Sequence, residues 1–140
     1  MRNNIATAAD RLPLSVIVAD SSPFSRAALA ALLSYDGYRV FQAENAGAAI
    51  SRIMTVDNLG VVLADLDMPG WRSIVERAVE RTNALVIALE GNVRFSKTCD
   101  LEQLGIGLRL QKPLVYDDVR RAILGNSGRP HEEAPHRKAA

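Results

Sequence analysis

The sequence has little of several features that would identify whole classes of protein. It contains one cysteine, Cys99, so no intramolecular disulfide can form, and no zinc-site spacing of cysteine or histidine surrounds it. The longest uninterrupted apolar run, residues 27–33, is far shorter than the roughly 18 residues that a membrane span needs. The N-terminal residues lack the apolar segment of a secretory signal. We therefore expect a cytoplasmic protein with no membrane contact.

An excess of charge of one sign is also lacking. Lysine and arginine number 17 against 16 aspartate and glutamate residues, for a formal charge of +1. This balance provides no general attraction for nucleic acid, and we expect no nucleic-acid partner. What is present is an ordinary globular composition, with 48% hydrophobic and 24% charged residues in 140. A chain of this length is expected to form one domain with a real core.

Apolar runs and turn signals alternate regularly through the chain. Short apolar runs that end at turn residues predict strands, and apolar residues recurring every three or four positions predict helices. We expect strands at residues 14–19, 38–43, 61–64, 85–89 and 106–110. We expect helices after Pro23, over residues 46–54, over 71–81, within 95–104 and over 115–123. In the helix over 71–81, the residues expected to face inward are Ile74, Val75, Ala78 and Val79.

This alternation predicts an α/β fold. Most of the strands are too apolar to have one solvated face, which favours a parallel sheet covered by helices on both sides. The folded domain is expected to span residues 13–125, after a flexible N-terminus at 1–12. Residues 126–140 are polar and rich in helix breakers, and we expect a disordered tail there.

Charged side chains follow four of the five expected strands. These residues are Asp20, Asp65, Asp67, Glu90 and Lys112. Because the carboxyl ends of parallel strands meet at one edge of a sheet, we expect an acidic pocket with one lysine at its side. Carboxylates and water suit a hard cation such as Mg²⁺. A single aspartate at a strand end is more often a cap or turn residue, but the whole arrangement favours a site.

At this point the chain from about residue 14 to 124 resembles the receiver domain of bacterial two-component response regulators. Asp65, followed by Met-Pro-Gly at residues 68–70, is similar to the family's phosphoacceptor aspartate and the turn after it. Lys112 and Pro113 are similar to the family's Lys-Pro pair, which is joined by a cis peptide. The resemblance implies a flavodoxin-like sheet with strand order 2-1-3-4-5.

The resemblance also implies a chemistry for these residues. Asp65 would accept a phosphoryl group from a histidine kinase, a phosphotransfer protein or a small phosphodonor, forming an aspartyl phosphate. Mg²⁺ would be held by Asp20, Asp65 and the backbone carbonyl of Asp67, and Lys112 would contact the phosphoryl group. Such a module is not an enzyme. It would stand alone, without an effector domain, and bind an output partner through the fourth helix, fifth strand and fifth helix.

Three positions depart from the family's pattern. Ala19 stands where the family usually has a first acidic residue, Glu90 where it has the switch hydroxyl of Thr or Ser, and Arg109 where it has the switch aromatic residue. A carboxylate at position 90 would repel a phosphoryl group. One hypothesis is an ion pair between Glu90 and Arg109 that replaces the switch. Glu90 paired with Lys112, and solvation of Glu90 and Arg109, are the alternatives.

Two other functions remain open from the sequence. The departures at positions 19, 90 and 109 are also consistent with a pseudo-receiver that is not phosphorylated and serves as a docking module. A more remote alternative comes from Asp65-Leu66-Asp67, which resembles the catalytic pair of haloacid-dehalogenase-type phosphatases. In those enzymes the motif follows the first strand and a Thr stands two residues after the second Asp, where this chain has Pro69.

Overall fold

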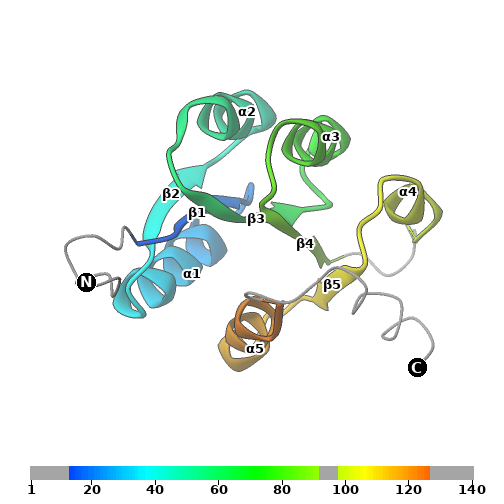
Figure 1. The fold of residues 1–140 in the computed structure, drawn as a ribbon. Coiled ribbons are helices and arrows are strands. Elements are labelled where there is room, and N and C mark those ends of the chain that lie inside the picture. The colour runs from blue at the N-terminus through cyan, green and yellow to red at the C-terminus, as the bar shows by residue number, and fades with distance from the viewer. Residues whose placement is uncertain (1–12, 92–97, 127–140) are drawn as a thin grey trace, which may run out of the picture.

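A five-stranded, all-parallel sheet lies at the centre of the computed structural model, which describes residues 13–91 and 98–126 (Figure 1). The sheet order is β2-β1-β3-β4-β5, which confirms the expected flavodoxin-like topology. The strands are β1 (Ser15–Ala19), β2 (Arg39–Ala43), β3 (Leu59–Asp65), β4 (Leu85–Glu90) and β5 (Leu108–Gln111).

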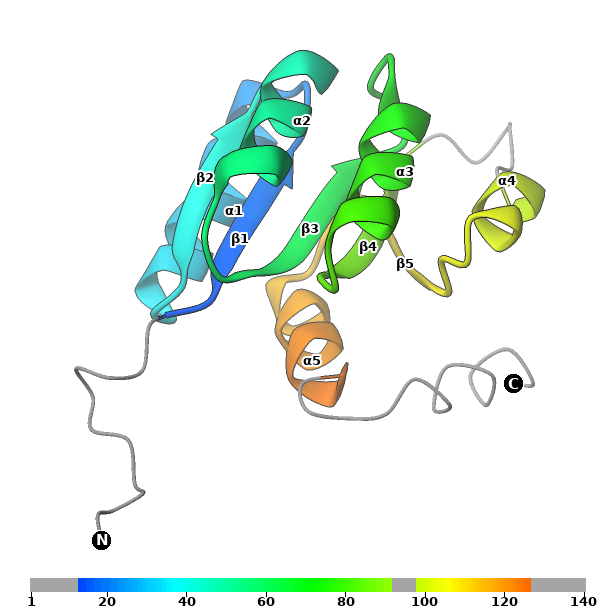
Figure 2. The same cartoon turned by 45° about the horizontal axis from the view of Figure 1, so that its top comes forward.

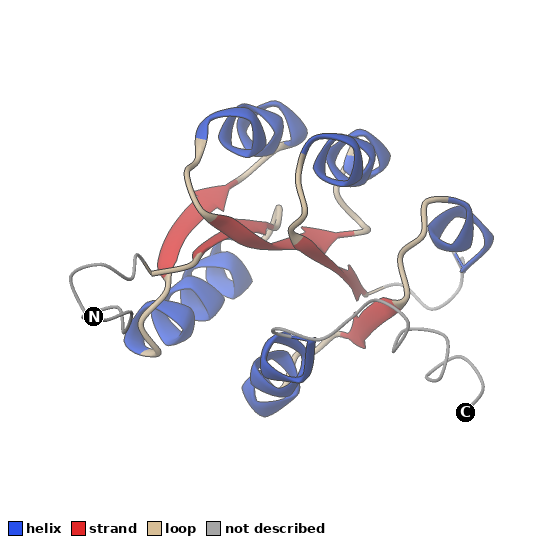
Figure 3. Ribbon diagram, in the orientation of Figure 1, coloured by secondary structure: helices blue, strands red, loops and turns tan. Residues whose placement is uncertain are grey.

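Helices cover both faces of this sheet (Figure 3). They are α1 (Pro23–Tyr35), α2 (Ala46–Thr55), α3 (Trp71–Arg81), α4 (Thr98–Gln103) and α5 (Tyr116–Asn126). In Figure 1, α1 and α5 lie below the sheet, and α2 and α3 lie above it. Two N-caps explain where helices begin: the side chain of Ser22 accepts from Ser25 N–H at the start of α1, and that of Asn45 accepts from Ala48 N–H at the start of α2.

The core is divided by the sheet into two layers. Ile17 and Val62 pack with Ile74 in the layer under α2 and α3. Val16 and Leu63 pack on the other side with α1 and α5. Successive strand residues point to opposite faces, so every residue of β1 is buried although neighbours belong to different layers. This burial on both faces is why the strands read as continuous apolar runs.

The strand register brings the carboxyl ends of the central strands level. Ala19 pairs with Ala64, and Asp65 pairs with Leu89. A tight turn then leads from β3 to α3, in which Met68 N–H donates to the Asp65 carbonyl. Gly70 ends the turn at φ +85°, a left-handed conformation that favours glycine. A Cβ at Gly70 would also lie 2.7 Å from the Cβ of Ala46, so a side chain would collide with α2.

Some element boundaries differ from those predicted, because backbone N–H groups expected in strands donate to carbonyls of the preceding helices. The strand expected from residue 38 begins at Arg39, since Tyr38 N–H donates to the Leu33 carbonyl at the end of α1. The strand expected from residue 106 begins at Leu108, since Ile106 N–H donates to Leu101 at the end of α4. β3 is longer than expected at both ends.

The inward face of α3 was predicted with one error. Ile74, Val75 and Ala78 are fully buried, but Val79 is 46% exposed. The buried stripe of this helix is therefore narrower than the apolar pattern indicates. α1 shows the same effect, because Phe24 is 90% exposed and Leu32 45% exposed, whereas Leu29 and Leu33 are buried.

The expected flexible N-terminus at 1–12 and nearly all of the expected tail at 126–140 lie outside the described residues. α5 extends to Asn126, one residue past the expected domain boundary. The short helix expected within residues 95–104 corresponds to α4. No helix in the described ranges has the length and apolar character to cross a bilayer.

Candidate functional site at the carboxyl edge of the sheet

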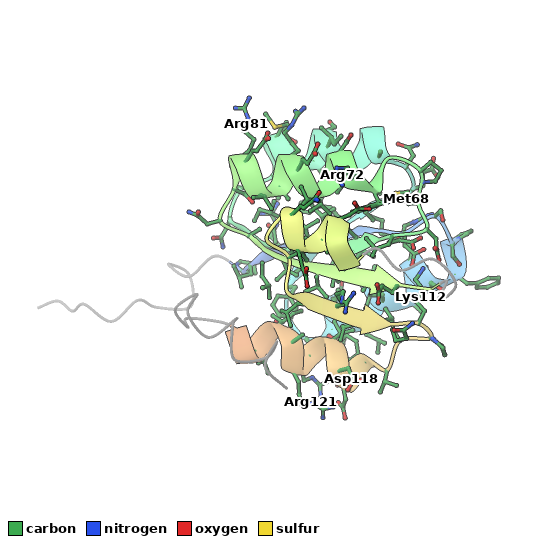
Figure 4. The ribbon with its side chains drawn as sticks, turned by 90° about the vertical axis from the view of Figure 1, so that its right-hand side faces the viewer. Met68, Arg72, Arg81, Lys112, Asp118 and Arg121 are labelled. Atoms are coloured by element: carbon green, nitrogen blue, oxygen red, sulfur yellow. The ribbon has the colours of Figure 1, made fainter. Side chains whose placement is uncertain are left out.

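The charged residues predicted to share one edge of the sheet do so. In Figure 2 the arrowheads of β1, β2 and β3 point to the same edge. Asp65 is the last residue of β3 and Glu90 the last of β4, while Asp20 directly follows β1. Lys112 follows β5 and lies at the strand ends in Figure 4. The peptide between Lys112 and Pro113 is cis, as the resemblance implied.

Asp65 lies at the centre of this edge and is only 1% exposed. Its Oδ1 accepts a hydrogen bond from Asp67 N–H at 2.9 Å and lies 3.0 Å from Lys112 Nζ. Its Oδ2 accepts from both the backbone N–H and the hydroxyl of Ser21, at 3.4 and 3.3 Å. Burial by itself raises the pKa of Asp65, but these hydrogen bonds and the lysine charge outweigh burial and hold the pKa below its ordinary value. Asp65 is therefore an ionised, buried carboxylate.

Asp20 is the second buried carboxylate and has no exposed surface. Its Oδ1 accepts from Ser22 N–H at 2.9 Å and lies 3.6 Å from Lys112 Nζ. Its Oδ2 is buried and has no hydrogen-bond partner, which among the described residues is true of no other side-chain oxygen or nitrogen. Burial raises the pKa of Asp20, against the opposing effects of the Ser22 hydrogen bond and the Lys112 charge. The site therefore favours the ionised form of Asp65 and disfavours the ionised form of Asp20.

The main chain around Asp20 is held from α1. Arg26 donates from Nη1 to the Asp20 carbonyl at 2.9 Å and from Nε to Gln42 Oε1 at 3.1 Å. The guanidinium group thus ties the loop after β1 to β2. This contact was not predicted from the sequence, where Arg26 reads as one more charged residue on a helix.

Asp67 and Gly91 meet at the mouth of the site. A Cβ built on Gly91 would lie 2.5 Å from Asp67 Oδ2 and 3.3 Å from the Lys112 side chain. The carboxylate of Asp67 therefore occupies space that any side chain at position 91 would need. Asp67 itself is exposed. Within the described ranges no three His, Cys, Asp or Glu side chains are grouped closely enough to hold a metal ion by themselves. Asp20 and Asp65 are the two buried carboxylates at this edge.

Glu90 pairs with Arg109 on the neighbouring strand. Arg109 Nη1 lies 3.4 Å from Glu90 Oε2, and the side chains are 36% and 20% exposed. The ion pair hypothesised between them is present. Lys112 instead contacts the two buried aspartates, and its link to Glu90 is a backbone hydrogen bond of 2.8 Å. Because the Glu90–Arg109 pair is partly solvated, we expect it to contribute less than about 1 kcal/mol.

An apolar groove of about 250 Å³ adjoins the site between α1 and the chain that leads into α5. Lys112 lines one end of it, so the groove and the carboxylate site share this side chain. The apolar lining comes from Ala28, Leu29, Leu32, Pro113 and Leu114. Phe24 and Val115 are exposed nearby in the sequence, at 90% and 59%. No local pattern in the sequence indicates this groove, because its walls are far apart along the chain.

The contact between Ser21 and Asp65 was not predicted from the sequence. Its only signal was a hydroxyl directly after a strand-end aspartate, a position where serine is a common turn residue. The structure brings that hydroxyl to the carboxylate of Asp65, 44 positions away.

The fold matches that of solved receiver domains. A CheY-like response regulator receiver domain protein from Methanospirillum hungatei JF-1 superposes with a TM-score of 0.74 at 19% identity, covering 81% of this chain and 93% of that one. CheY6 from R. sphaeroides, in complex with the P1 domain of CheA3, gives 0.70 at 21% identity, covering 84% and 98%.

A response regulator protein from Burkholderia pseudomallei, with a phosphorylated aspartic acid, a calcium ion and citrate, gives a TM-score of 0.73 at 20% identity, covering 90% of this chain and 73% of that one. No family model matches the chain, and no curated protein matches it in sequence. The strand order agrees with these likenesses in structure. The chain has the fold of a response regulator receiver domain.

Proposed function

We propose that this chain is a receiver module of two-component signalling that accepts a phosphoryl group on Asp65 and signals by binding another protein. The observation that carries this proposal is the ion pair between Asp65 and Lys112. Lys112 Nζ lies 3.0 Å from Asp65 Oδ1, and Asp65 is almost completely buried. A phosphoacceptor must be ionised to attack phosphorus, and a cation beside it must neutralise the charge that the phosphoryl group brings.

The two oxygens of Asp65 have different surroundings, which favours one as the nucleophile. Oδ1 is held by Asp67 N–H and Lys112, whereas Oδ2 faces Ser21, an exposed residue. Attack by Oδ2 on a phosphodonor forms an oxygen–phosphorus bond. The bond from phosphorus to the donor breaks, and its electron pair leaves with the donor group. Lys112 then neutralises a phosphoryl oxygen.

The residues present fit a divalent cation. The unpartnered, buried Oδ2 of Asp20 is the kind of oxygen that a cation satisfies, and it lies beside the ionised Asp65. Mg²⁺ is commonly held by one or two carboxylates, with water and substrate phosphates completing the octahedron. Asp20, Asp65 and the Asp67 carbonyl would supply the protein ligands. When bound, the ion would neutralise charge on the transferred group. The calcium ion and phosphorylated aspartic acid in the neighbour from B. pseudomallei support this assignment.

The same geometry supports a proposal about the partners. A phosphodonor protein must bring its phosphoryl group to Asp65, and the apolar groove beside Lys112 offers a surface on which such a protein could rest. The complex of CheY6 with the P1 domain of CheA3 supports a histidine kinase or phosphotransfer protein as donor. The output partner is assigned to the face of α4, β5 and α5. We assign the module no enzymatic activity, and its cytoplasmic location stays a prediction.

Mass spectrometry of the intact protein tests the proposal. Wild type, Asp65→Asn and the control Asp57→Asn, which removes an exposed aspartate away from the site, are incubated with acetyl phosphate and Mg²⁺. Wild type and Asp57→Asn should each gain one phosphoryl group, and Asp65→Asn none. A wild-type protein that gains nothing overturns the proposal and favours the pseudo-receiver, whose function lies in its surface alone.

A further inference from the structure

We propose that Ser21 binds the phosphoryl group on Asp65 and supplies the hydroxyl that Glu90 does not provide from β4. This inference rests on the proposed function, since it concerns the same site. It assigns to the loop after β1 a role that the resemblance to receiver domains places at the end of β4.

The position of Ser21 carries the inference. Its hydroxyl and its backbone N–H both donate to Asp65 Oδ2, at 3.3 and 3.4 Å. Both donors therefore lie beside the oxygen that would bond to phosphorus, next to the position that the phosphoryl oxygens would occupy. These hydrogen bonds are long, and contacts of this kind often tighten only when the reacting group is bound.

After phosphorylation these donors have a more strongly charged acceptor within reach. Once Oδ2 is bonded to phosphorus it becomes a weaker acceptor, while the terminal phosphoryl oxygens carry a charge of nearly two. The Ser21 hydroxyl can rotate about its Cβ–Oγ bond and donate to one of them. Ser21 is an exposed residue whose hydrogen bonds to Asp65 are partly buried, so it lies where the site meets solvent.

The described residues at the end of β4, Glu90 and Gly91, have no side-chain donor for this contact. Glu90 at the end of β4 has only acceptor oxygens when ionised, and one of them lies 3.4 Å from Arg109 Nη1. Gly91 adds no side chain, and the carboxylate of Asp67 lies over it. Lys112 and Ser21 are thus the side-chain donors within reach of the Asp65 carboxylate among the described residues.

The test compares Ser21→Ala with Ser21→Thr, which keeps the hydroxyl, and with Ser73→Ala, an exposed serine in α3. The rate of phosphoryl gain from acetyl phosphate with Mg²⁺ is followed by intact mass. We expect Ser21→Ala to slow this rate by about tenfold, the effect of losing one hydrogen bond to a charged group. Ser21→Thr should retain most of the rate, and Ser73→Ala all of it.

A second measurement separates phosphoryl contact from a structural role. Beryllium fluoride forms a tetrahedral stand-in for the phosphoryl group on a carboxylate, and its binding is followed by fluorine NMR. Ser21→Ala should weaken this binding by about tenfold while its urea midpoint and its Mg²⁺ affinity, read from Trp71 fluorescence, stay at wild-type values.

The outcomes separate the two proposals. If wild type is phosphorylated and Ser21→Ala matches it in rate and beryllium fluoride binding, Ser21 has no such role while Asp65 remains the acceptor. If Ser21→Ala lowers the urea midpoint and Ser21→Thr does not restore the rate, the serine acts only on structure and the inference is overturned. If wild type gains no phosphoryl group, both proposals fall together.

Discussion

Lys112 Nζ lies 3.0 Å from Asp65 Oδ1, and this single ammonium group also reaches the buried carboxylate of Asp20 at 3.6 Å. The lysine thus serves two carboxylates that are otherwise closed to water. Burial raises the pKa of Asp20, and the neighbouring Asp65 charge adds to that rise. Asp65 is buried as well, but the hydrogen bonds from Asp67 N–H, Lys112 and Ser21 outweigh burial and lower its pKa.

Replacing the lysine should therefore destabilise the fold. We expect Lys112→Met to lower the free energy of unfolding at pH 7 by about 3 kcal/mol, since it leaves a buried carboxylate without its cation. The pKa of Asp65 should rise in this variant. Urea unfolding measures the first effect and NMR titration of the carboxyl the second. Arg121→Met, which breaks the exposed pair with Asp118, is the control and should cost less than about 1 kcal/mol. Equal losses in the two variants would contradict the importance of burial.

Removing the charge of Asp20 should have the opposite effect. Because the folded-state pKa of Asp20 is raised, wild type loses stability as pH rises from the ordinary value of 3.8 through the folded pKa. Asp20→Asn abolishes that loss and keeps the Oδ1 acceptor for Ser22 N–H. We expect it to stabilise the protein at pH 7 by about 1 kcal/mol. The stabilisation that Mg²⁺ gives wild type in thermal unfolding should disappear. A variant less stable than wild type at pH 7 would show that the Asp20 charge is favourable as it stands.

The Glu90–Arg109 pair should be weak in energy. Its side chains are 20% and 36% exposed, so solvent screens their attraction. A double-mutant cycle of Glu90→Ala and Arg109→Ala, measured by urea unfolding, should give a coupling energy below about 1 kcal/mol. A coupling of several kcal/mol would mean that the pair is held more rigidly and more dryly than its exposure indicates.

The charge of Glu90 should matter more for phosphorylation than for folding. We expect Glu90→Gln to speed phosphoryl gain from acetyl phosphate on the order of fivefold, the equivalent of about 1 kcal/mol, because one repelling charge is removed. Glu80→Gln neutralises an exposed glutamate of α3 and serves as the control. If Glu90→Gln reacts no faster than this control, the carboxylate lies too far from the phosphoryl group to repel it.

A second group of polar contacts, exposed to solvent, joins the end of α1 to α5. Tyr116 Oη donates to Asp36 Oδ2 at 2.8 Å, and Arg120 Nε donates to the same oxygen at 3.2 Å. The tyrosine hydrogen bond and the arginine hold the pKa of Asp36 below its ordinary value, so this contribution to stability is present above pH 3.8 and is lost as pH falls through the folded pKa.

Tyr116→Phe should therefore raise the pKa of Asp36 in an NMR titration. The free energy of unfolding of this variant should depend less steeply on pH in acid than that of wild type. Tyr35→Phe removes the hydroxyl of a tyrosine that is 89% exposed and should leave the titration of Asp36 unchanged. An unchanged pKa in Tyr116→Phe would assign the shift to Arg120 alone.

Much of the fold was predictable because its signals are local. Apolar runs, a serine N-cap before Pro23 and the turn at Gly70 identify the elements without reference to the rest of the chain. The errors occurred at helix ends and at the margin of a helix face. Tyr38 N–H and Ile106 N–H bond to carbonyls of the preceding helices instead of joining strands, and Val79 is 46% exposed.

For the site, the sequence alone determined which charged residues end which strands, and the parallel sheet made their meeting at one edge unavoidable. Only the tertiary structure decided how they share their contacts. In the folded chain Lys112 contacts the two aspartates and Glu90 pairs with Arg109. The hydroxyl of Ser21 donates to Asp65. Distances of this kind depend on strand register, loop path and side-chain packing together, and no local pattern in the sequence encodes that combination.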